Sequence, residues 1–433
     1  MRFDKISITN TRLIGENALE LSFRKDKNIF VLLGDNGYGK TTILDAMATA
    51  LAVYAMQFPG IQDYQISDLD VHINRHGHRA SYSAITAELT YEGSPISVTR
   101  YRKGVANTPK TNYDQIKQLA LEKKEAIIRQ EEVALPIFAY YGTGRGQFSV
   151  PERKRGFQKT YERWDCYKSA IKPETDFKRF FGWFDLMESE ELHMMKELQD
   201  FNYKSPVLEV VRSAISMFVD CYQNPRIKVS PLRFIMDRVE KDGTRHELRI
   251  EQLSDGYKIV IAMVADLAAR MAEANPKMPN ALHAKGVVLI DEVDLHLHPN
   301  WQRTILRKLH DVFPNIQFIV STHSPIIVVG SSDIAQVINL NNPTEEVPDI
   351  SKSNVGLVLL SELFGLSSLK SPIWDEKIKE RENILSKSEL SEDDKERLEE
   401  LNQEMNGLSI QDPNIIRTNE LLEKIANELH IQL

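Results

Sequence analysis

Three short runs of apolar residues predict buried strands of a parallel sheet. They occupy residues 29–33, 287–290 and 318–320, and none alternates between apolar and polar positions. An uninterrupted apolar run of this length is typical of a strand covered on both faces. Apolar helices are predicted directly after the first run and at about residues 259–271. Together these elements predict an α/β fold.

The segment between the first predicted strand and its helix fits the phosphate-binding pattern G-x-x-x-x-G-K-[ST] from Gly34 to Thr41. In such a loop, backbone N–H groups and the start of the following helix bind phosphates. We expect Lys40 to reach the β and γ phosphates of a nucleoside triphosphate and the Thr41 hydroxyl to ligate Mg²⁺. The alternative is a glycine-rich turn that carries Lys-Thr by chance. The predicted nucleotide contacts in this loop are Asn36, Gly37, Gly39, Lys40, Thr41 and Thr42.

Two acidic residues, Asp291 and Glu292, directly follow the second apolar run. A central strand that ends in carboxylates supplies the second half of a triphosphate site. We predict that Asp291 holds the Mg²⁺ shell and that Glu292 activates the attacking water as general base. An ordinary buried strand with an acidic end is the alternative.

The third apolar run is followed by His323, at the end of what is expected to be the neighbouring strand. The interval between Glu292 and His323 leaves room for one helix, so the two strands are expected to be parallel neighbours. His323 is then predicted to donate to the γ-phosphate. His296 and His298 lie in this interval, but no third metal ligand is evident nearby. A structural or interface role is therefore favoured over metal binding for this pair.

The predicted helix near residue 259 is preceded by the sequence L-S-D-G-Y at residues 253–257. With the phosphate loop, the two acids and His323, this segment resembles the signature motif of the ABC-type ATPases, usually Leu-Ser-Gly-Gly-Gln. Ser254 and Gly256 match that pattern, whereas positions 255 and 257 depart from it.

That resemblance implies a role for the signature across a subunit boundary. Ser254 and Gly256 of one subunit would complete the ATP site of a second, in a head-to-tail dimer with two-fold symmetry. ATP would hold the dimer together, and hydrolysis would release it. A higher oligomer is left open.

Composition narrows the class of protein further. Its 42% hydrophobic and 27% charged residues are typical of a globular chain, and a net charge of −8 argues against a surface that is basic throughout. We find no run of about 18 apolar residues and no apolar N-terminal segment, so a cytoplasmic protein without membrane contact is expected. Cys166 and Cys221 are too few for a disulfide framework or a zinc site.

The long interval between Lys40 and Ser254 favours a branch of this superfamily with an inserted arm. Residues 1–10, followed by a strand-like segment at 19–23, resemble the N-termini of the RecF and Rad50 types. No heptad run predicts the long coiled coil of the Rad50 type. Two shorter helices are predicted instead, at about residues 113–131 and 188–222.

Three longer motifs, at residues 139–145, 291–299 and 321–325, carry a closer resemblance. They are similar to a family of small bacterial ABC-type ATPases once described as "predicted ATP-binding protein involved in virulence". That family includes the ATPase subunits of Septu and retron-linked anti-phage systems, and the resemblance covers about residues 1–330. It implies an ATP-gated sensor that restrains or positions a separate nuclease.

The related overcoming-lysogenization-defect nucleases carry a Toprim metal site after the ATPase. No matching constellation of acids occurs after His323, so we expect no nuclease active site in this chain and a nuclease subunit in trans.

The expected fold is therefore α/β: an ABC-type P-loop ATPase core with a mainly helical insertion and a small helical C-terminal tail. The core is expected to be assembled from both ends of the chain. The predicted division is an N-terminal part of the core at 1–110, a mainly helical insertion at 111–225 with a core strand near 135–142, a C-terminal part of the core at 226–345, and the tail at 346–433.

Basic and aromatic residues are concentrated at residues 145–172. This composition is typical of DNA or RNA contact with base stacking. The alternative, slightly favoured, is a solvated face with its aromatic rings in the core. Arg145 is also a candidate for contact with the nucleotide or the dimer seam, and Gln147 for the glutamine-loop position. The basic residues are Arg145, Arg153, Lys154, Arg155, Lys159, Arg163, Lys168 and Lys172, and the aromatic ones are Phe148, Phe157, Tyr161, Trp164 and Tyr167.

The tail is acidic from Asp375 to Glu404, with a helix start signal at Ser391 and Asp394 and a stop signal at Gly407. Packing on the core and docking of a partner are both open for its apolar positions. These are Leu398, Leu401 and Met405, followed in a last predicted helix by Leu421, Leu422, Ile425 and Leu429.

These features lead us to expect slow ATP hydrolysis, coupled to opening and closing of a dimer that controls a nuclease in anti-phage defence. The rival hypothesis is a DNA-repair or chromosome-maintenance ATPase that clamps DNA directly. A transporter ATPase is a distant third.

Overall fold

The structure, a computed structural model, describes residues 1–103, 111–146, 151, 158, 160–173, 177–387 and 391–406. Its internal contacts divide the chain into two units, Met1–Val358 and Leu359–Leu433. The division falls inside the predicted tail rather than at residue 346.

A five-stranded parallel sheet forms the centre of the first unit, in the order β12-β3-β11-β10-β6. Every residue of β3, β6, β10 and β11 is buried, as expected for strands covered on both faces. The three apolar runs of the sequence became β3, β10 and β11, and the predicted parallel pairing of β10 with β11 is confirmed. The strands are β3 (Ile29–Leu33), β6 (Ile137–Tyr141), β10 (Gly286–Ile290), β11 (Ile316–Thr322) and β12 (Ala335–Asn339).

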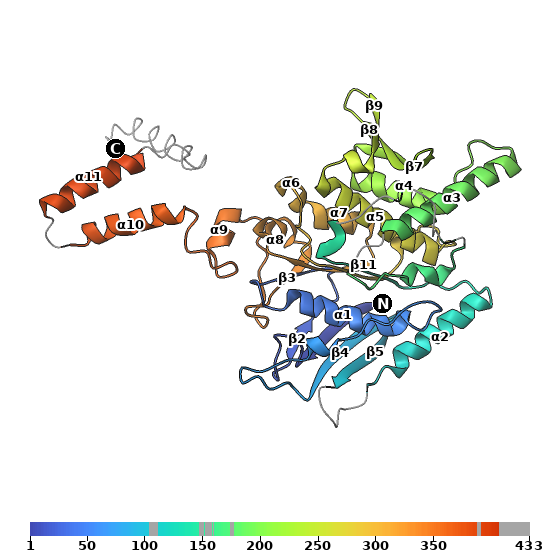
Figure 1. The fold of residues 1–433 in the computed structure, drawn as a ribbon, viewed down its shortest axis with the longest axis horizontal. Coiled ribbons are helices and arrows are strands. Elements are labelled where there is room, and N and C mark those ends of the chain that lie inside the picture. Colours follow the sequence, from blue (N-terminus) through green and yellow to red (C-terminus); the bar gives the residue numbers. More distant parts are fainter. Residues whose placement is uncertain are drawn as a thin grey trace. The chain divides into compact units, whose positions relative to one another are not determined.

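A four-stranded antiparallel sheet, in the order β2-β1-β4-β5, lies on the other side of helix α1 from the parallel sheet (Figure 1). A third sheet is small and antiparallel, in the order β7-β8-β9. The strands are β1 (Arg2–Thr9), β2 (Leu19–Ser22), β4 (Tyr82–Tyr91), β5 (Ser94–Lys103), β7 (Tyr222–Val229), β8 (Leu232–Val239) and β9 (Arg245–Arg249).

Helices α4, α5 and α7 lie on the face of the parallel sheet opposite to α1 (Figure 1). Helix α5 is buried from Ile259 onward, which agrees with the apolar helix predicted there. The helices of the first unit are α1 (Lys40–Ala55), α2 (Asp114–Ile128), α3 (Phe177–Leu198), α4 (Pro206–Phe218), α5 (Asp255–Ala274), α6 (Pro299–Gln302), α7 (Ile305–Val312) and α8 (Pro325–Ser331), with α9 (Val355–Leu360) at the boundary.

The prediction of one helix at about 188–222 is wrong. The structure has two helices there, α3 and α4, and Tyr222 already begins a strand. Pro206 occupies the first turn of α4, where proline is tolerated because its missing N–H has no helical partner. Gln199, just after α3, has a positive φ of 54°, which ends the right-handed helix. A proline and a single left-handed residue therefore interrupt the helical pattern.

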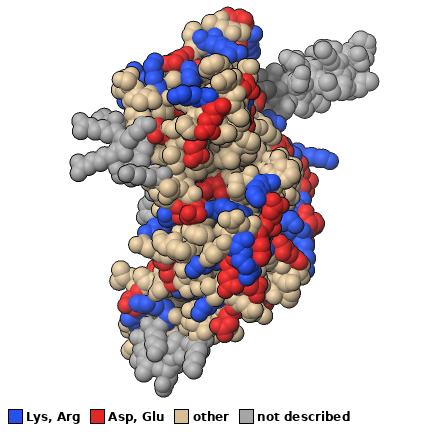
Figure 2. All heavy atoms as spheres, turned by 90° about the vertical axis from the view of Figure 1, so that its right-hand side faces the viewer, with Lys and Arg blue, Asp and Glu red and all other residues tan. Residues whose placement is uncertain are grey.

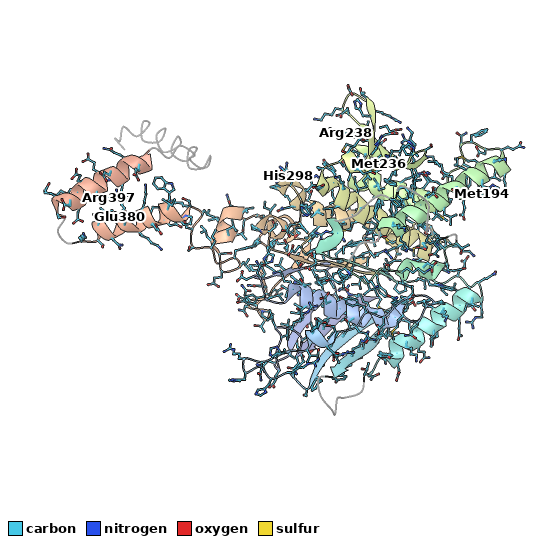
Figure 3. All side chains as sticks on the ribbon, in the orientation of Figure 1. Met194, Met236, Arg238, His298, Glu380 and Arg397 are labelled. Atoms are coloured by element: carbon cyan, nitrogen blue, oxygen red, sulfur yellow. The ribbon has the colours of Figure 1, made fainter. Side chains whose placement is uncertain are left out.

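The second unit contains α10 (Pro372–Leu385) and α11 (Glu392–Asn406). Glu380 and Arg397 point toward one another from these two helices, with 2.8 Å between Oε1 and Nε (Figure 3). The predicted start of α11 is confirmed, because the Ser391 N–H donates to Asp394 and the Asp394 N–H donates to the Ser391 hydroxyl. Leu401 is buried. The other predicted tail positions from Met405 onward lie outside the described side chains.

The surface carries charges of both signs. On the face that Figure 2 shows, blue basic and red acidic side chains are interspersed rather than gathered by sign. Among the described residues, no helix is long and apolar enough to cross a membrane.

Candidate functional site

The phosphate loop connects the buried strand β3 to helix α1. Gly37 and Gly39 have φ of 88° and 85°, in the left-handed region that glycine adopts without steric cost. Gly39 caps α1 without a side-chain hydrogen bond, so the first N–H groups of the helix are available to an anion. The loop therefore has the backbone geometry that phosphate binding requires.

Lys40 is buried, and its ammonium group lies within this loop. Its Nζ donates to the carbonyl oxygens of Gly34 at 2.7 Å and Asp35 at 3.0 Å. Burial lowers the pKa of Lys40, while the neighbouring carboxylates, Asp291 first, oppose that shift. The ammonium group is thus held beside the loop by neutral carbonyls, and within the described part of the chain it has no ion pair.

Thr41 and Asp291 meet although 250 positions separate them in the sequence. The Thr41 hydroxyl donates to Asp291 Oδ2 at 2.8 Å. The other carboxylate oxygen, Oδ1, accepts from the Ser321 hydroxyl at 2.5 Å. The two residues predicted to ligate a metal ion are therefore adjacent, and strand β11 fixes the orientation of the carboxylate.

Glu292 follows Asp291 in a tight turn. Its φ of 47° is left-handed, and its N–H donates to the Ser321 hydroxyl at 2.7 Å. The same hydroxyl thus serves both acids, donating to one and accepting from the other. Within the described residues the Glu292 carboxylate, which is half-buried, makes no hydrogen bond or ion pair. The backbone of Glu292 is therefore held in place, while its carboxylate has no partner among the described residues.

Arg145 binds the backbone of this turn, a role that the sequence did not predict for it. Its guanidinium donates to the carbonyl oxygens of Gly142 at 2.9 Å and Asp291 at 2.5 Å, and also to that of Glu292. Burial lowers the pKa of Arg145, and the surrounding acids oppose the shift. One cation therefore binds three backbone carbonyls, two of them in the acidic turn.

Gly142 explains part of the Tyr-Tyr-Gly-Thr-Gly-Arg motif. A Cβ atom on Gly142 would lie 2.5 Å from Pro173 Cβ and 2.8 Å from its carbonyl oxygen. The Gly142 N–H donates to that same oxygen at 2.8 Å. The glycine is therefore required for close approach, whereas a Cβ on Gly144 would meet nothing within 4 Å.

His323 follows β11 at the edge where the phosphate loop leaves β3. Thr322 is aligned with Leu33 in the parallel pairing, so His323 comes at the level of the first loop residue, Gly34. The imidazole is half-buried and, among the described residues, has no hydrogen-bond partner. Its position is compatible with the predicted contact to a phosphate.

The signature segment is not joined to the phosphate loop of the same chain. Ser254 is exposed and caps α5 through its backbone, without a side-chain cap. Gly256 packs on the loop after Glu292, because a Cβ there would lie 2.8 Å from the His296 carbonyl oxygen. No hydrogen bond or ion pair of the described residues connects Ser254 or Gly256 with residues 34–42.

The His-x-His pair has a structural role in this arrangement. His298 Nδ1 accepts the Asn300 N–H at 3.3 Å and so caps α6, where Figure 3 labels it. His296 supplies the carbonyl that covers Gly256. In the part of the chain that the structure describes, no group of three or more His, Cys, Asp or Glu residues is arranged to hold a metal ion.

At three positions of the 145–172 segment, Arg163, Lys168 and Tyr167, the structure favours the structural alternative to nucleic-acid contact. Arg163 donates to two backbone carbonyls, Lys168 pairs with Asp165 at 2.9 Å, and the Tyr167 ring is fully buried. Seven of the predicted contacts lie outside the described residues: Gln147, Phe148, Arg153, Lys154, Arg155, Phe157 and Lys159.

Two family models match the chain. Residues 5–205 match a family described as "AAA domain". Residues 229–329 match "AAA domain, putative AbiEii toxin, Type IV TA system". The first match contains the phosphate loop, and the second contains the signature, the two acids and His323.

Curated relatives cover most of the chain. The Retron Ec83 probable ATPase of Escherichia coli is 30% identical over an alignment of 369 positions, and the match covers 72% of this chain and 67% of the relative. The Retron Vc95 probable ATPase of Vibrio cholerae is 29% identical and matches 72% of this chain and 69% of its own length. The Septu protein PtuA of Bacillus mycoides is 26% identical over 84% of this chain but only 45% of its own length.

Among solved structures, the SMC head domain from Thermotoga maritima matches 78% of this chain with a TM-score of 0.43 and 18% identity. The relatives, the family models and the site geometry agree. The chain is an ATPase, and it belongs to the family of RecF/Rad50-like P-loop ATPases that includes the retron ATPases and Septu PtuA.

Proposed function

We propose that this ATPase is an ATP-gated dimer that controls a nuclease partner in anti-phage defence. The observation that carries the proposal is the contact between the Thr41 hydroxyl and the Asp291 carboxylate, with the Glu292 carboxylate, which has no partner among the described residues, beside it. A metal-binding pair, a free acid and a phosphate loop at one sheet edge are the parts that triphosphate hydrolysis uses.

ATP and Mg²⁺ fit these residues. Thr41 and Asp291 offer the oxygen ligands that Mg²⁺ prefers, and the ion would neutralise charge on the β and γ phosphates. Lys40 would exchange its carbonyl partners for phosphate oxygens, which satisfies a buried cation with an opposite charge. The other predicted contacts, Asn36, Gly37, Gly39 and Thr42, belong to the same loop and helix start.

Glu292 is proposed as the general base. Ser321 and Arg145 fix the backbone around it, so the carboxylate can be positioned while keeping no partner of its own. A positioned base contributes roughly 10²- to 10⁴-fold to a rate. His323 is proposed to donate to the γ-phosphate from the adjacent strand.

Dimerisation is supported by the separation of the two half-sites. Ser254 and Gly256 begin α5 without contacting residues 34–42 of their own chain, and Ser254 is exposed. The signature of one subunit facing the phosphate loop of another would join the two halves, twice in a symmetric pair. ATP would then be part of the interface and would stabilise it by mass action.

A nuclease partner is proposed from the family relationship. The relatives named for retrons and Septu span most of this chain, and the resemblance of residues 139–145, 291–299 and 321–325 extends to the same family. In this proposal the ATPase cycle changes the dimer, and the dimer restrains or releases the nuclease.

The test is a capture experiment in the native host with tagged full-length chains in Mg-ATP. Glu292→Gln should bind ATP, turn it over slowly and retain a closed dimer with a stoichiometric nuclease, identified by mass spectrometry after nuclease treatment. Lys40→Ala, which cannot close, should recover less of that partner, while a substitution of the exposed Glu190 on α3, Glu190→Gln, should behave as wild type.

Two outcomes contradict the proposal. Normal turnover by Glu292→Gln would show that another group is the base. Recovery of DNA without any protein companion would favour the rival, a repair-type clamp that binds DNA directly.

A further inference from the structure

A cavity of about 470 Å³ lies beside the sheet, and none of the phosphate-loop residues lines it. Its walls come from three places: the loop at residues 60–64 after α1, the segment at 158–172, and the first turn of α3. A volume of several hundred Å³ is typical of small-molecule sites. This space is therefore large enough for a mononucleotide.

Among the described residues, every charged side chain that lines the cavity is basic. Lys168, Lys172, Lys178 and Arg179 all contribute to the lining. Behind the wall, Lys168 pairs with Asp165 and Arg179 pairs with Glu273.

Two of the four basic side chains in the lining are not in ion pairs with described residues. Among the described residues, Lys172 and Lys178 have no carboxylate partner. Lys172 Nζ donates to the neutral Gln62 Oε1 at 3.0 Å, from the opposite wall. A phosphate placed between the walls would gain two charge-assisted contacts without breaking an ion pair. In a chain with a net charge of −8, this is a local positive site.

Aromatic rings and a glycine complete the lining. Tyr64 and Tyr161 are half-buried at the cavity, and the Arg179 guanidinium lies 5.9 Å from the Tyr161 ring centroid. Gly60 has a φ of 74°, in the left-handed region that glycine adopts without steric cost, and so turns the loop at this wall of the cavity. Phosphate contacts beside aromatic surface are the chemistry that recognises nucleotides.

We propose that this cavity is a second, non-catalytic site for a phosphate-bearing nucleoside, either free or at the end of a single nucleic-acid strand. The phosphate lies between Lys172 and Lys178, and the base lies against the tyrosine rings.

The cavity wall is hydrogen-bonded to the strand that leads to the catalytic turn. Ala170 accepts the Tyr140 N–H at 2.7 Å, and Pro173 accepts the Gly142 N–H at 2.8 Å. Arg145, three residues after Gly142, then binds the carbonyls of Asp291 and Glu292.

A second connection starts at Tyr64. Its hydroxyl donates to Asp45 Oδ1 at 3.1 Å on α1, the helix that begins with Lys40. Occupancy of the cavity therefore reaches the ATP site through β6 and through α1. This coupling rests on the proposed ATPase cycle, whereas binding to the cavity does not.

The binding test uses the full chain with Lys40→Ala, which silences the catalytic site. Fluorescence anisotropy is measured with N-methylanthraniloyl-AMP and with a labelled hexathymidylate, with and without a 5′-phosphate. We expect saturable binding that is weakened at least about tenfold by Lys172→Glu with Lys178→Glu. The matched control, Lys117→Glu with Lys241→Glu, changes the charge equally at exposed lysines away from the cavity and should bind as the parent does.

The two probes separate the sources of the phosphate. Binding of AMP alone assigns a free nucleotide, and a strand that binds only when phosphorylated assigns a strand end. No saturable binding of any probe, or equal loss in both double variants, overturns the site. If the charge reversal prevents folding, Lys172→Gln with Lys178→Gln answers the same question without adding acids.

Coupling is measured separately in the chain with an intact phosphate loop. Saturating probe should change the kcat of ATP hydrolysis about fivefold, and the Lys172→Glu, Lys178→Glu chain should not respond. An unchanged kcat in the parent overturns the coupling. Failure of the ATPase itself would appear in the absence of probe, so the two proposals fail distinguishably.

Discussion

The acidic turn after β10 and the signature segment before α5 are built in opposite ways. Asp291 is buried and held by Thr41 and Ser321, and its backbone is bound by Arg145. Ser254 is exposed and makes no side-chain cap. The first region is complete within one chain. The second presents an exposed Ser254 that has no hydrogen bond to residues 34–42 of its own chain. A surface that contributes to the site of another subunit is expected to have this property.

The largest effect is expected from Lys40→Ala, which removes the cation of the phosphate loop beside the acidic turn. Loss of one partner of a charge-assisted contact costs about 2–5 kcal/mol, so ATP affinity should fall at least about 30-fold. Isothermal titration with ATP measures this. Retained affinity would show that the loop does not bind the phosphates.

Ser254→Arg alters the other region. ATP should still bind each monomer with wild-type affinity, while the ATP-dependent dimer and turnover are lost, the latter by about 100-fold as for removal of a transition-state donor. Mass photometry with ATP and the Glu292→Gln background reads the dimer. Normal dimerisation of Ser254→Arg would contradict the trans site.

Gly142→Ala and Gly144→Ala form a matched pair within one motif. The first Cβ would clash with Pro173, so unfolding free energy should fall by about 1–3 kcal/mol. The second Cβ meets nothing within 4 Å and should be nearly neutral. Denaturant unfolding compares them, and equal values would show that the close approach is not rigid.

Arg145→Lys tests how the acidic turn is held. Lysine keeps the charge but cannot bind three carbonyls in a fixed fork, so kcat should fall about tenfold while ATP affinity is unchanged. Steady-state kinetics beside equilibrium binding separate the two quantities. A parallel loss of affinity would mean that Arg145 contacts the nucleotide itself.

The smallest effect concerns Glu188, outside both regions. Burial raises its pKa to about 7, against the Ile227 N–H and Arg212, which lower it. A carboxyl with a raised folded pKa contributes stability that is full below about pH 4.5 and is lost as pH rises through 7. Glu188→Gln should flatten that dependence by on the order of 1 kcal/mol, measured by unfolding at pH 5.5 and pH 8. An unchanged pH slope would place the titration elsewhere.

Some features of the fold and the site could be predicted from the sequence and others could not, depending on whether they leave a pattern of residue types. Buried parallel strands are marked in the sequence by apolar runs, so β3, β10 and β11 could be predicted. The positions of Lys40, Asp291 and His323 near the ends of these strands follow from the same runs. The role of Arg145 could not be predicted, because two of its carbonyl partners lie 146 and 147 positions away in the sequence. Every residue has a backbone carbonyl, so the residue types at those positions do not reveal the contact. The helical pattern alone does not predict the break between α3 and α4, because the break depends on Pro206 and on the left-handed backbone of Gln199.

The order of strands in the parallel sheet also determines when, during synthesis on the ribosome, the sheet and the ATP site can form. Strand β3 pairs only with β11 and β12, and Thr41 meets Asp291 across 250 positions. At roughly 5–20 residues per second, a ribosome needs on the order of 10–50 s to add that interval. During this time the five apolar residues of β3 have no neighbouring strand, and no ATP site exists. A chain truncated before β11 is therefore an aggregation hazard rather than a weakened enzyme, and a cell acquires this activity only after β11 has been synthesised.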